Sequence, residues 1–468
     1  APEDSLRAGT VPWNPKDQFG YDVNLRYRPS DSLRVRYGFR SFSETVSLLG
    51  DVRRPQFRPY VEDELYDTRR EDHSLAASLR LSLSLNADLI AGWNTFDREK
   101  MTVRRDLEPD TTRLVLGGQD TTRYVGQLVR LSVATTDERV LGGQFGLEYR
   151  RESGSGGRIL DTASQSREPA ITNLAAWAAL RYQLSPAWTV EATARVGHNS
   201  RYQHPVVPAV HLLWRPTEQW RWRLGYATGF RAPAIQELFF NFIDVNHYII
   251  GSPSLAAERS RNLRLQGEWT GNRRLPLTVD GTFFYNRIQD RITIADLDGD
   301  ARFTFVNLAE FTTYGSTLQL RYVPSEQWAI TAGGALTRVS NQATSPETDL
   351  PEFLTLGELR SEVTFTPSGT GLNFRLDHRY IGRRDRYVVA SDGAVSQGYI
   401  GDYHLLHLTA QQTFWQGRLT LTGGVKNLLN RDRVPVTGGG GGGAHSGGGG
   451  ARLVDFGRNF FVGLRLRL

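Results

Sequence analysis

The sequence predicts an all-β fold, a transmembrane antiparallel β-barrel, from three observations. Long segments alternate between apolar and polar residues, as a strand with one apolar face and one wet face requires. Short turns alternate with long polar connections along the chain. No apolar run approaches the roughly 18 to 20 residues of a membrane-spanning helix, which excludes helical membrane proteins but not barrels.

The segment QWRWRLGYATGF (219–230) shows the alternation most clearly. One face would carry Trp220, Trp222, Leu224, Tyr226, Thr228 and Phe230. The other would carry Arg221, Arg223, Gly225, Ala227, Gly229 and Arg231. Similar alternation occurs at 75–85, 372–380 and 462–468. Strands of a β-sandwich average about 5 to 6 residues, whereas a membrane strand needs roughly 9 to 11. We therefore expect the tryptophans to face lipid and the arginines to face water.

The connections between these segments fall into two classes of length. Short turns are predicted at 28–32, 85–89, 135–139, 184–188, 215–219, 271–276, 323–327, 367–371 and 414–418. Longer polar connections are predicted at 44–72, 97–121, 152–170, 231–258, 341–352, 384–397 and 431–453. Short turns at one end and long loops at the other are typical of outer-membrane barrels, in which the short turns face the periplasm.

Strands and turns together predict about 19 to 20 strands, although single-chain bacterial barrels normally have an even number. If the last strand ends in the periplasm, the first one (20–29) runs inward from the cell surface, and residues 1–18 would start outside. Either a strand near 5–13 escapes recognition or sequence upstream is missing. We favour missing sequence.

Composition excludes several classes of protein. The chain has 468 residues, a formal net charge of +6 and no cysteine, so disulfides and cysteine metal sites are impossible. Acidic residues are spread among the arginines and no basic run occurs, which argues against nucleic-acid binding. No signal-peptide pattern is visible at the start. Arginine far outnumbers lysine, either through codon bias or because the protein handles anions.

From about residue 220 onward the chain resembles the TonB-dependent outer-membrane receptors. The first matching motif comprises Gly229, Phe230, Arg231, Ala232 and Pro233, followed by QEL (236–238). The segment 251–269, with Pro253, Leu255 and Glu258, resembles the family's second box. Segments 283–294, 306–322, 423–435 and 457–468 follow in the family's order.

This resemblance implies TonB-dependent uptake of a scarce, bulky nutrient such as an iron–siderophore complex, haem or cobalamin, across the bacterial outer membrane. The family's barrel has 22 strands and a plug domain that binds the TonB complex, and the plug has no counterpart here. Residues 1–468 are thus expected to form the barrel domain without its plug and first strands. Outer-membrane lipid would surround it, and a metal chelate or haem would be its ligand. Residues 431–453 would form a glycine-rich extracellular loop, and Leu468 stands where the family usually ends in an aromatic residue.

Candidate ligand contacts lie in the loop after the first motif. Arg231 would face the lumen by parity, while Pro233 ends the strand because it lacks a backbone donor. Asn246, His247 and Tyr248 follow, and in haem receptors of this family a histidine lies in that interval, so His247 is a possible haem ligand. A loop histidine without special function is the more common alternative.

We expect no resident cofactor, metal site or catalytic centre. His404 and His407 would lie on opposite faces of a strand, which rules out a shared metal ion. DLDGD (296–300) lacks the spacing of a calcium loop. No nucleophile elbow occurs, so catalysis is not expected. Two alternatives stay open: a plugless, passive porin-like or adhesion barrel, and a soluble all-β binding protein.

Overall fold

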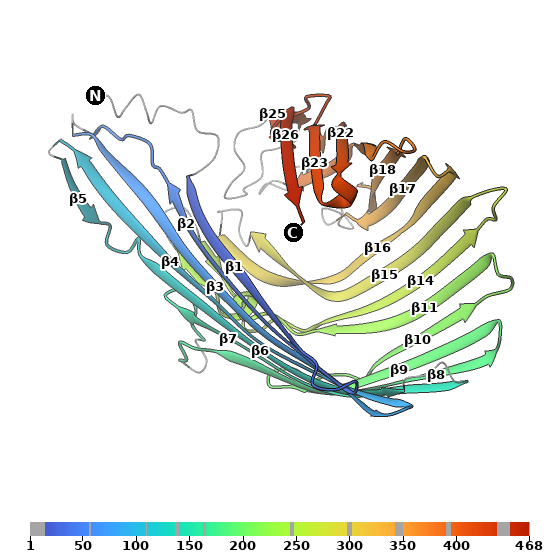
Figure 1. Ribbon diagram of the computed structural model, residues 1–468. Helices are drawn as coiled ribbons and strands as arrows, with labels where there is room; N and C mark the ends of the chain where they lie inside the picture. Colours follow the sequence, from blue (N-terminus) through green and yellow to red (C-terminus); the bar gives the residue numbers. More distant parts are fainter. Residues whose placement is uncertain are drawn as a thin grey trace.

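The computed structural model describes residues 15–467 except 56–57, 109, 136–139, 162–164, 244–247, 297–301, 342–349, 390–394 and 438–449. Nearly all regular structure is β-strand, and most of the strands form one large curved sheet (Figure 1). Among the described residues, no helix has the length and apolar character of a membrane-spanning helix.

The large sheet contains 22 strands within the described part of the chain. Three of them are short additions: β5 (Asp110–Leu114), β12 (Asn241–Ile243) and β13 (Tyr248–Ile250). The remaining nineteen form the wall, in agreement with the predicted count. In chain order the wall strands are β1 (Lys16–Tyr27), β2 (Leu33–Leu48), β3 (Tyr60–Ser82), β4 (Leu85–Leu107), β6 (Asp120–Thr135), β7 (Leu141–Gly156), β8 (Ala170–Ser185), β9 (Trp188–Asn199), β10 (Val207–Trp214), β11 (Trp220–Arg231), β14 (Glu258–Thr270), β15 (Leu277–Asp296), β16 (Arg302–Ser325), β17 (Trp328–Ser340), β18 (Phe353–Phe365), β19 (Leu372–Ile381), β22 (Tyr403–Phe414), β23 (Leu419–Lys426) and β26 (Asn459–Leu466).

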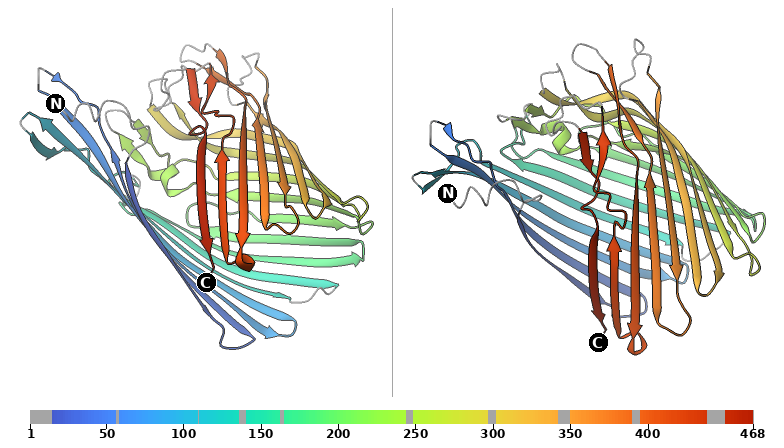
Figure 2. Two further views of the ribbon diagram at one scale, coloured as in Figure 1. Left: turned by 45° about the horizontal axis from the view of Figure 1, so that its top comes forward. Right: turned by 90° about the horizontal axis from the view of Figure 1, so that it is seen from above.

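Each wall strand pairs antiparallel with the wall strands next to it in the chain. The two end strands, β1 and β26, have no pairing with each other among the described residues. They are the two ends of the curved sheet, and a gap separates them in Figure 1, so the wall is an open trough. Figure 2 shows the same sheet from two other sides. Within the described part of the chain, each end strand therefore presents one row of backbone donors and acceptors without a partner strand.

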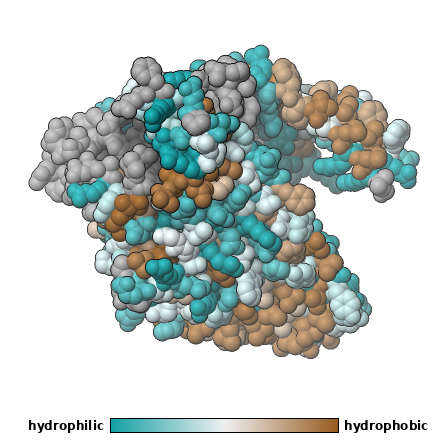
Figure 3. All heavy atoms as spheres, turned by 90° about the vertical axis from the view of Figure 1, so that its left-hand side faces the viewer, coloured by the Kyte–Doolittle hydropathy of each residue, from teal (hydrophilic) through white to brown (hydrophobic). Residues whose placement is uncertain are grey.

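The two faces of the wall differ as the alternation predicts. Leu263 and Leu265 of β14 are exposed on the outer face, whereas Asn262, Arg264 and Gln266 line a hollow on the inner face. The end strands expose Phe19, Tyr21, Val23, Leu25 and Tyr27 of β1, and Phe460, Val462, Leu464 and Leu466 of β26. From the left of Figure 1, hydrophobic residues gather along the lower flank and hydrophilic residues above it (Figure 3).

Aromatic rings gather where the strands meet the short turns. Trp188 stacks on Trp214 with ring centroids 5.2 Å apart, and Trp220 stacks on Trp222 at 5.6 Å. Trp328 stacks on Phe365 at 4.4 Å. Such girdles flank the apolar band of membrane-spanning barrels, so these rings mark the boundary of the band on the side of the short turns.

Several predicted boundaries were wrong. Long loops were expected at 44–72 and 97–121, but β2, β3, β4 and β6 continue far into both ranges. Their outer ends lack apolar periodicity because both faces meet water beyond the bilayer. Polar pairs hold them instead, such as Thr45 Oγ1 to Asp67 Oδ1 at 2.6 Å and Lys100 Nζ to Glu64 Oε1 at 2.6 Å. The turn expected at 85–89 lies between Ser82 and Leu85.

The long connections carry small elements of their own. The connection after β11 contains the short helix α2 (Ile235–Phe239) together with β12 and β13. A second sheet of four strands combines β20 (Arg384–Val389), β21 (Val395–Ile400), β24 (Arg433–Val436) and β25 (Gly450–Leu453). A 3-10 turn, η2 (Trp415–Gly417), joins β22 to β23. Most of the glycine-rich run lies outside the described residues, and β24 and β25 flank it.

Candidate functional site in the lumen

Arg231, at the end of β11, joins the wall to the connection that follows. Its Nε and Nη2 donate to the two carboxylate oxygens of Glu258 on β14, at 2.8 and 2.5 Å. Its Nη1 donates to Glu237 of α2, with a closest distance of 2.9 Å. All three nitrogens of the Arg231 guanidinium thus donate hydrogen bonds to one of these two carboxylates. A contact between Arg231 and a substrate stays a prediction.

Both acceptors of Arg231 are themselves held by backbone donors. Glu258 accepts the N–H of Ile292 at 2.8 Å, and Glu237 accepts the N–H of Ala234 at 2.7 Å. Carboxylates that accept both charged and backbone donors are strongly fixed in position. Arg231 and its two partners therefore set where the segment 232–257 leaves the wall; we call its described residues, 232–243 and 248–257, the inner loop.

The inner loop folds back into the lumen and builds an apolar core there. The core consists of Ile159, Ile171, Ile235, Leu238, Phe239, Leu255 and Ile292. Ile235 of α2 packs on Gly154 of β7, where a Cβ atom would come within 2.8 Å of its methyl group. Gly154 and Glu148 lie an even number of positions apart on β7, so both positions lie on its inner face. Figure 2 shows α2 within the concave side of the sheet.

Charged side chains seal the edge of this core. The Arg201 guanidinium lies 4.5 Å from the ring centroid of Phe239 and bonds to the buried carboxylate of Asp161. Burial raises the pKa of the neighbouring Tyr202 hydroxyl, although the charge of Arg201 opposes this. The inner loop is thus packed and ion-paired against the wall.

The remaining residues of the two predicted motifs support this packing. Pro233 and Leu255 are buried, and the Phe230 ring lies 4.5 Å from that of His204. Gly229 leaves room for Ser260, whose Oγ would lie 2.3 Å from an added Cβ. Ala232 is half-buried, and Pro253 is exposed.

The structure places only one of the three candidate residues at 246–248. Tyr248 is half-buried and begins β13, which pairs in parallel with β16 at Arg302. Asn246 and His247 lie outside the described residues, as does most of the DLDGD segment. The proposed haem ligation by His247 stays a prediction.

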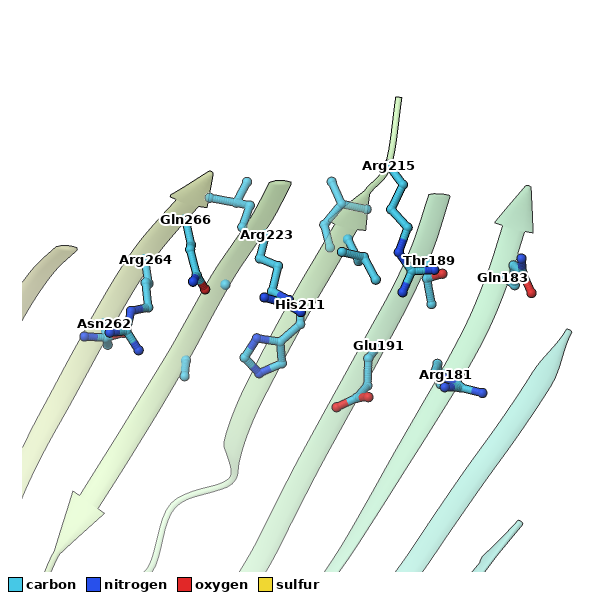
Figure 4. A pocket seen from close by; sticks show the side chains of 15 residues that line it. Arg181, Gln183, Thr189, Glu191, His211, Arg215, Arg223, Asn262, Arg264 and Gln266 are labelled. Atoms are coloured by element: carbon cyan, nitrogen blue, oxygen red, sulfur yellow. The ribbon is translucent and has the colours of Figure 1, made fainter. Parts of the chain in front are cut away.

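A second feature of the lumen is a basic hollow of about 650 Å³ in the inner wall near the short turns. Figure 4 shows its polar side chains projecting from β8, β9, β10, β11 and β14. The charged or titratable members are Arg181, Glu191, His211, Arg215, Arg223 and Arg264. Within the described residues, none of the four arginines has an ion-pair partner. Glu191, the only acid lining the hollow, lies opposite Arg181 and His211 in the strand register.

Several other arginines of the inner wall are paired. Glu148 accepts from Arg130 and Arg195, with Nη2–oxygen distances of 2.5 and 2.7 Å. Arg375 bonds to both Glu362 and Asp377. The basic hollow, with four arginines and one acid in its lining, is a local excess of positive charge.

The predicted opposition of His404 and His407 is confirmed. His404 Nδ1 lies 2.9 Å from His378 Nε2 on the outer face, whereas His407 accepts the backbone N–H of Asn427. No cluster of three or more potential metal-binding His, Cys, Asp or Glu residues occurs among the described residues.

A tall antiparallel wall, apolar outside and charged inside, with a long connection folded into its lumen, defines a receptor-type outer-membrane β-barrel. The sequence pattern of the family described as TonB dependent receptor-like, beta-barrel matches residues 12–428. The chain belongs to this family. It lies in the bacterial outer membrane and is not an enzyme. Its location also excludes the alternative of a soluble all-β binding protein.

The chain is similar to several characterised proteins. It is 26% identical over 266 residues to the iron-regulated outer membrane virulence protein of Vibrio cholerae. The matched segment covers 52% of this chain and 39% of that protein. The copper transporter OprC matches 96% of this chain and 71% of its own, with a TM-score of 0.71 and 13% identity. The siderophore receptor PirA of Acinetobacter baumannii matches 96% and 77%, with a TM-score of 0.67 and 11% identity. At such identities the structural likeness concerns the fold.

The basic hollow was only partly accessible to sequence reasoning. The alternation placed Arg223 on the wet face, but it did not show that Arg181, Arg215 and Arg264 converge with it. That convergence follows from the strand register, which no single segment reveals. Arginines at wet positions of neighbouring strands, outnumbering the acids at those positions, were the available signal.

Proposed function

We propose that this chain forms the wall of an importer that takes up a bulky, negatively charged metal chelate by TonB-dependent transport. An iron–siderophore complex is the preferred cargo, ahead of haem and cobalamin. Iron regulation of the Vibrio relative and the names of the siderophore receptors support this choice. A plug domain would close the lumen and connect the wall to the TonB complex.

The observation that carries the proposal is the basic hollow. Four guanidinium groups on neighbouring strands share one side of the lumen with a single carboxylate. Walls of one charge sign raise the local concentration of the opposite ion, and guanidinium binds carboxylate and similar planar oxygen groups well. Iron chelators commonly bind the metal through anionic oxygens. The hollow therefore suits an anionic cargo, or an acidic surface of the plug that guards its path.

The inner loop supports selective import rather than free diffusion. It is fixed by Arg231 and its own apolar core, and it occupies part of the lumen on the outer side. A cargo that enters from outside would meet this loop before it reaches the basic hollow. The two features define an order of contact along the lumen.

The free edges of β1 and β26 suggest how the wall closes. An unpaired edge strand in a bilayer leaves polar backbone groups in hydrocarbon, at a cost of several kcal/mol per group. We propose that further antiparallel strands join the two edges. Three would complete the 22-stranded barrel of the family.

Uptake measured in cells tests the proposal. Cells that express the full-length receptor containing this chain should accumulate radiolabelled ferric chelate, and a proton uncoupler should abolish accumulation. Purified receptor in planar bilayers should be nearly closed. Uptake insensitive to the uncoupler, together with steady high conductance, would instead identify the passive porin-like barrel.

A further inference from the structure

Three arginines form a second basic group, on the opposite face of the wall. They are Arg259 and Arg261 of β14 and Arg287 of β15, which we call the outer arginine cluster. Arg259 and Arg261 share parity with Leu263 and Leu265, which are exposed on the outer face. Arg287 shares parity with Phe283 and Tyr285, which pair with the same two leucines. All three arginines therefore project from the wall toward the membrane side.

The cluster lies near the outer edge of the apolar band. Trp269, at the periplasmic end of β14, packs against the ring of Trp220 and marks the inner boundary. Eight residues separate Trp269 from Arg261, which amounts to roughly 20 Å along the barrel axis at about 3.4 Å per residue and a tilt of about 40°. The apolar band of such barrels is about 25 Å tall. Arg261 thus approaches the level of the outer lipid head groups, and Arg259 lies one step beyond it.

The positive charges in the cluster oppose one another. Arg261 is the direct cross-strand partner of Arg287, and Arg259 lies two residues away on the same face. Like charges directly opposite in a sheet are destabilising. Arg287 pairs with Glu310, but its Nε is buried without a hydrogen-bond partner. Arg259 and Arg261 are exposed and have no ion-pair partner among the described residues.

A small hollow completes the arrangement. It has a volume of about 260 Å³, and the three arginines line it together with Thr228 and Gln289. The Gln289 amide adds a neutral donor beside the guanidiniums, whereas the Thr228 hydroxyl already donates to the carbonyl oxygen of Pro208 at 3.2 Å. Such a set of side chains suits a phosphate group, because guanidinium binds phosphate oxygens at two points. A phosphate dianion bound between Arg261 and Arg287 would also attract both guanidiniums and so offset their mutual repulsion.

We infer that the outer arginine cluster binds the phosphorylated head group of a glycolipid in the outer leaflet of the outer membrane. The lipid phosphate lies between Arg261 and Arg287, and Arg259 contacts it from the extracellular side. The acyl chains then lie along Leu263, Leu265 and Phe283. Such a lipid screens the cross-strand repulsion and fixes the depth of this part of the wall.

The test uses the full-length receptor in detergent, with diphosphoryl lipid A as the probe. We expect lipid A to raise the melting temperature of the wild type. The double variant Arg259→Gln/Arg261→Gln should bind lipid A at least tenfold more weakly. The matched control is Arg69→Gln/Arg123→Gln, which removes two outward arginines that already pair with Glu71 and Asp97. Heat-modifiable migration verifies that each variant is folded.

Four outcomes overturn the inference. Protection by inorganic phosphate equal to that by lipid A would assign the site to a free anion. Equal protection by phosphatidylglycerol would reduce the site to general attraction to an anionic lipid surface. Equal losses in the test and control variants would show a nonspecific charge effect. An unchanged affinity of the Arg259→Gln/Arg261→Gln variant would show that these arginines do not bind the head group.

Discussion

Arg231 and Glu258 form a two-point ion pair across the β11–β14 ladder, with nitrogen–oxygen distances of 2.8 and 2.5 Å. The same guanidinium reaches Glu237 of α2 at 2.9 Å, so one side chain connects two wall strands to the inner loop. The pair lies where the strand ends and the loop turns into the lumen. The position of the loop thus depends on a planar group with three separate donor nitrogens.

The variant Arg231→Lys should loosen the inner loop without unfolding the wall. An ammonium group is a point charge and cannot reproduce the fork, so we expect a loss of about 1 to 2 kcal/mol in loop stability, since the pair is partly exposed. Limited proteolysis in the segment 232–257 measures this loss. Arg221→Lys is the matched control, because Arg221 pairs with Glu268 near the short turns. Equal cleavage of both variants would contradict the assigned role of Arg231.

Gly154→Val should displace α2. A Cβ at this position would come within 2.8 Å of Ile235 and 3.0 Å of the Tyr124 ring, so the helix has to move. Gly357→Val is the control, since a Cβ there meets no atom within 4 Å. Hydrogen exchange at α2 should rise in the first variant and stay unchanged in the second. Unchanged exchange in both would show that α2 does not depend on this contact.

The sequence predicted the wall well and the inner loop poorly, for physical reasons. Alternation at 219–230 identified both faces of β11 because a bilayer and an aqueous lumen impose opposite demands on neighbouring residues. Above the bilayer those demands disappear, so the continuation of β3 and β4 left no hydrophobic pattern. Parity placed Arg231 toward the lumen correctly. Its contact with Glu237 depends on how the inner loop folds, and the pairing of Arg261 with Arg287 depends on register.

Removal of positive charge from the basic hollow should weaken the seal of the lumen. If Arg181, Arg223 and Arg264 seat an acidic surface of the plug, the triple change of these residues to Gln weakens that contact. Cells that express the full-length variant should become severalfold more sensitive to vancomycin, which is too large for ordinary porins. Arg221→Gln changes a paired arginine of the lower inner wall and should leave sensitivity unchanged. Equal sensitivity of the triple variant and the wild type would refute this role.

Alkaline pH should loosen the edge of the inner-loop core at Tyr202. Burial raises the pKa of this phenol above its unfolded value of about 10. The stabilisation is therefore fully present below pH about 10 and is lost as the pH rises through the higher folded pKa. Absorbance at 295 nm, as the difference between wild type and Tyr202→Phe, follows the ionisation. A midpoint at or below that of a free tyrosine would contradict the assigned burial.

The measurement that tests the account most directly compares two adjacent residues of β14. The chain has no cysteine, so the full-length variants Arg264→Cys and Leu265→Cys each give one reactive site in it. In permeabilised outer membranes, a water-soluble maleimide should label the first variant, and only a lipid-soluble maleimide should label the second. The reverse pattern, or equal labelling of both positions by the water-soluble reagent, would show that β14 does not separate a bilayer from an aqueous lumen.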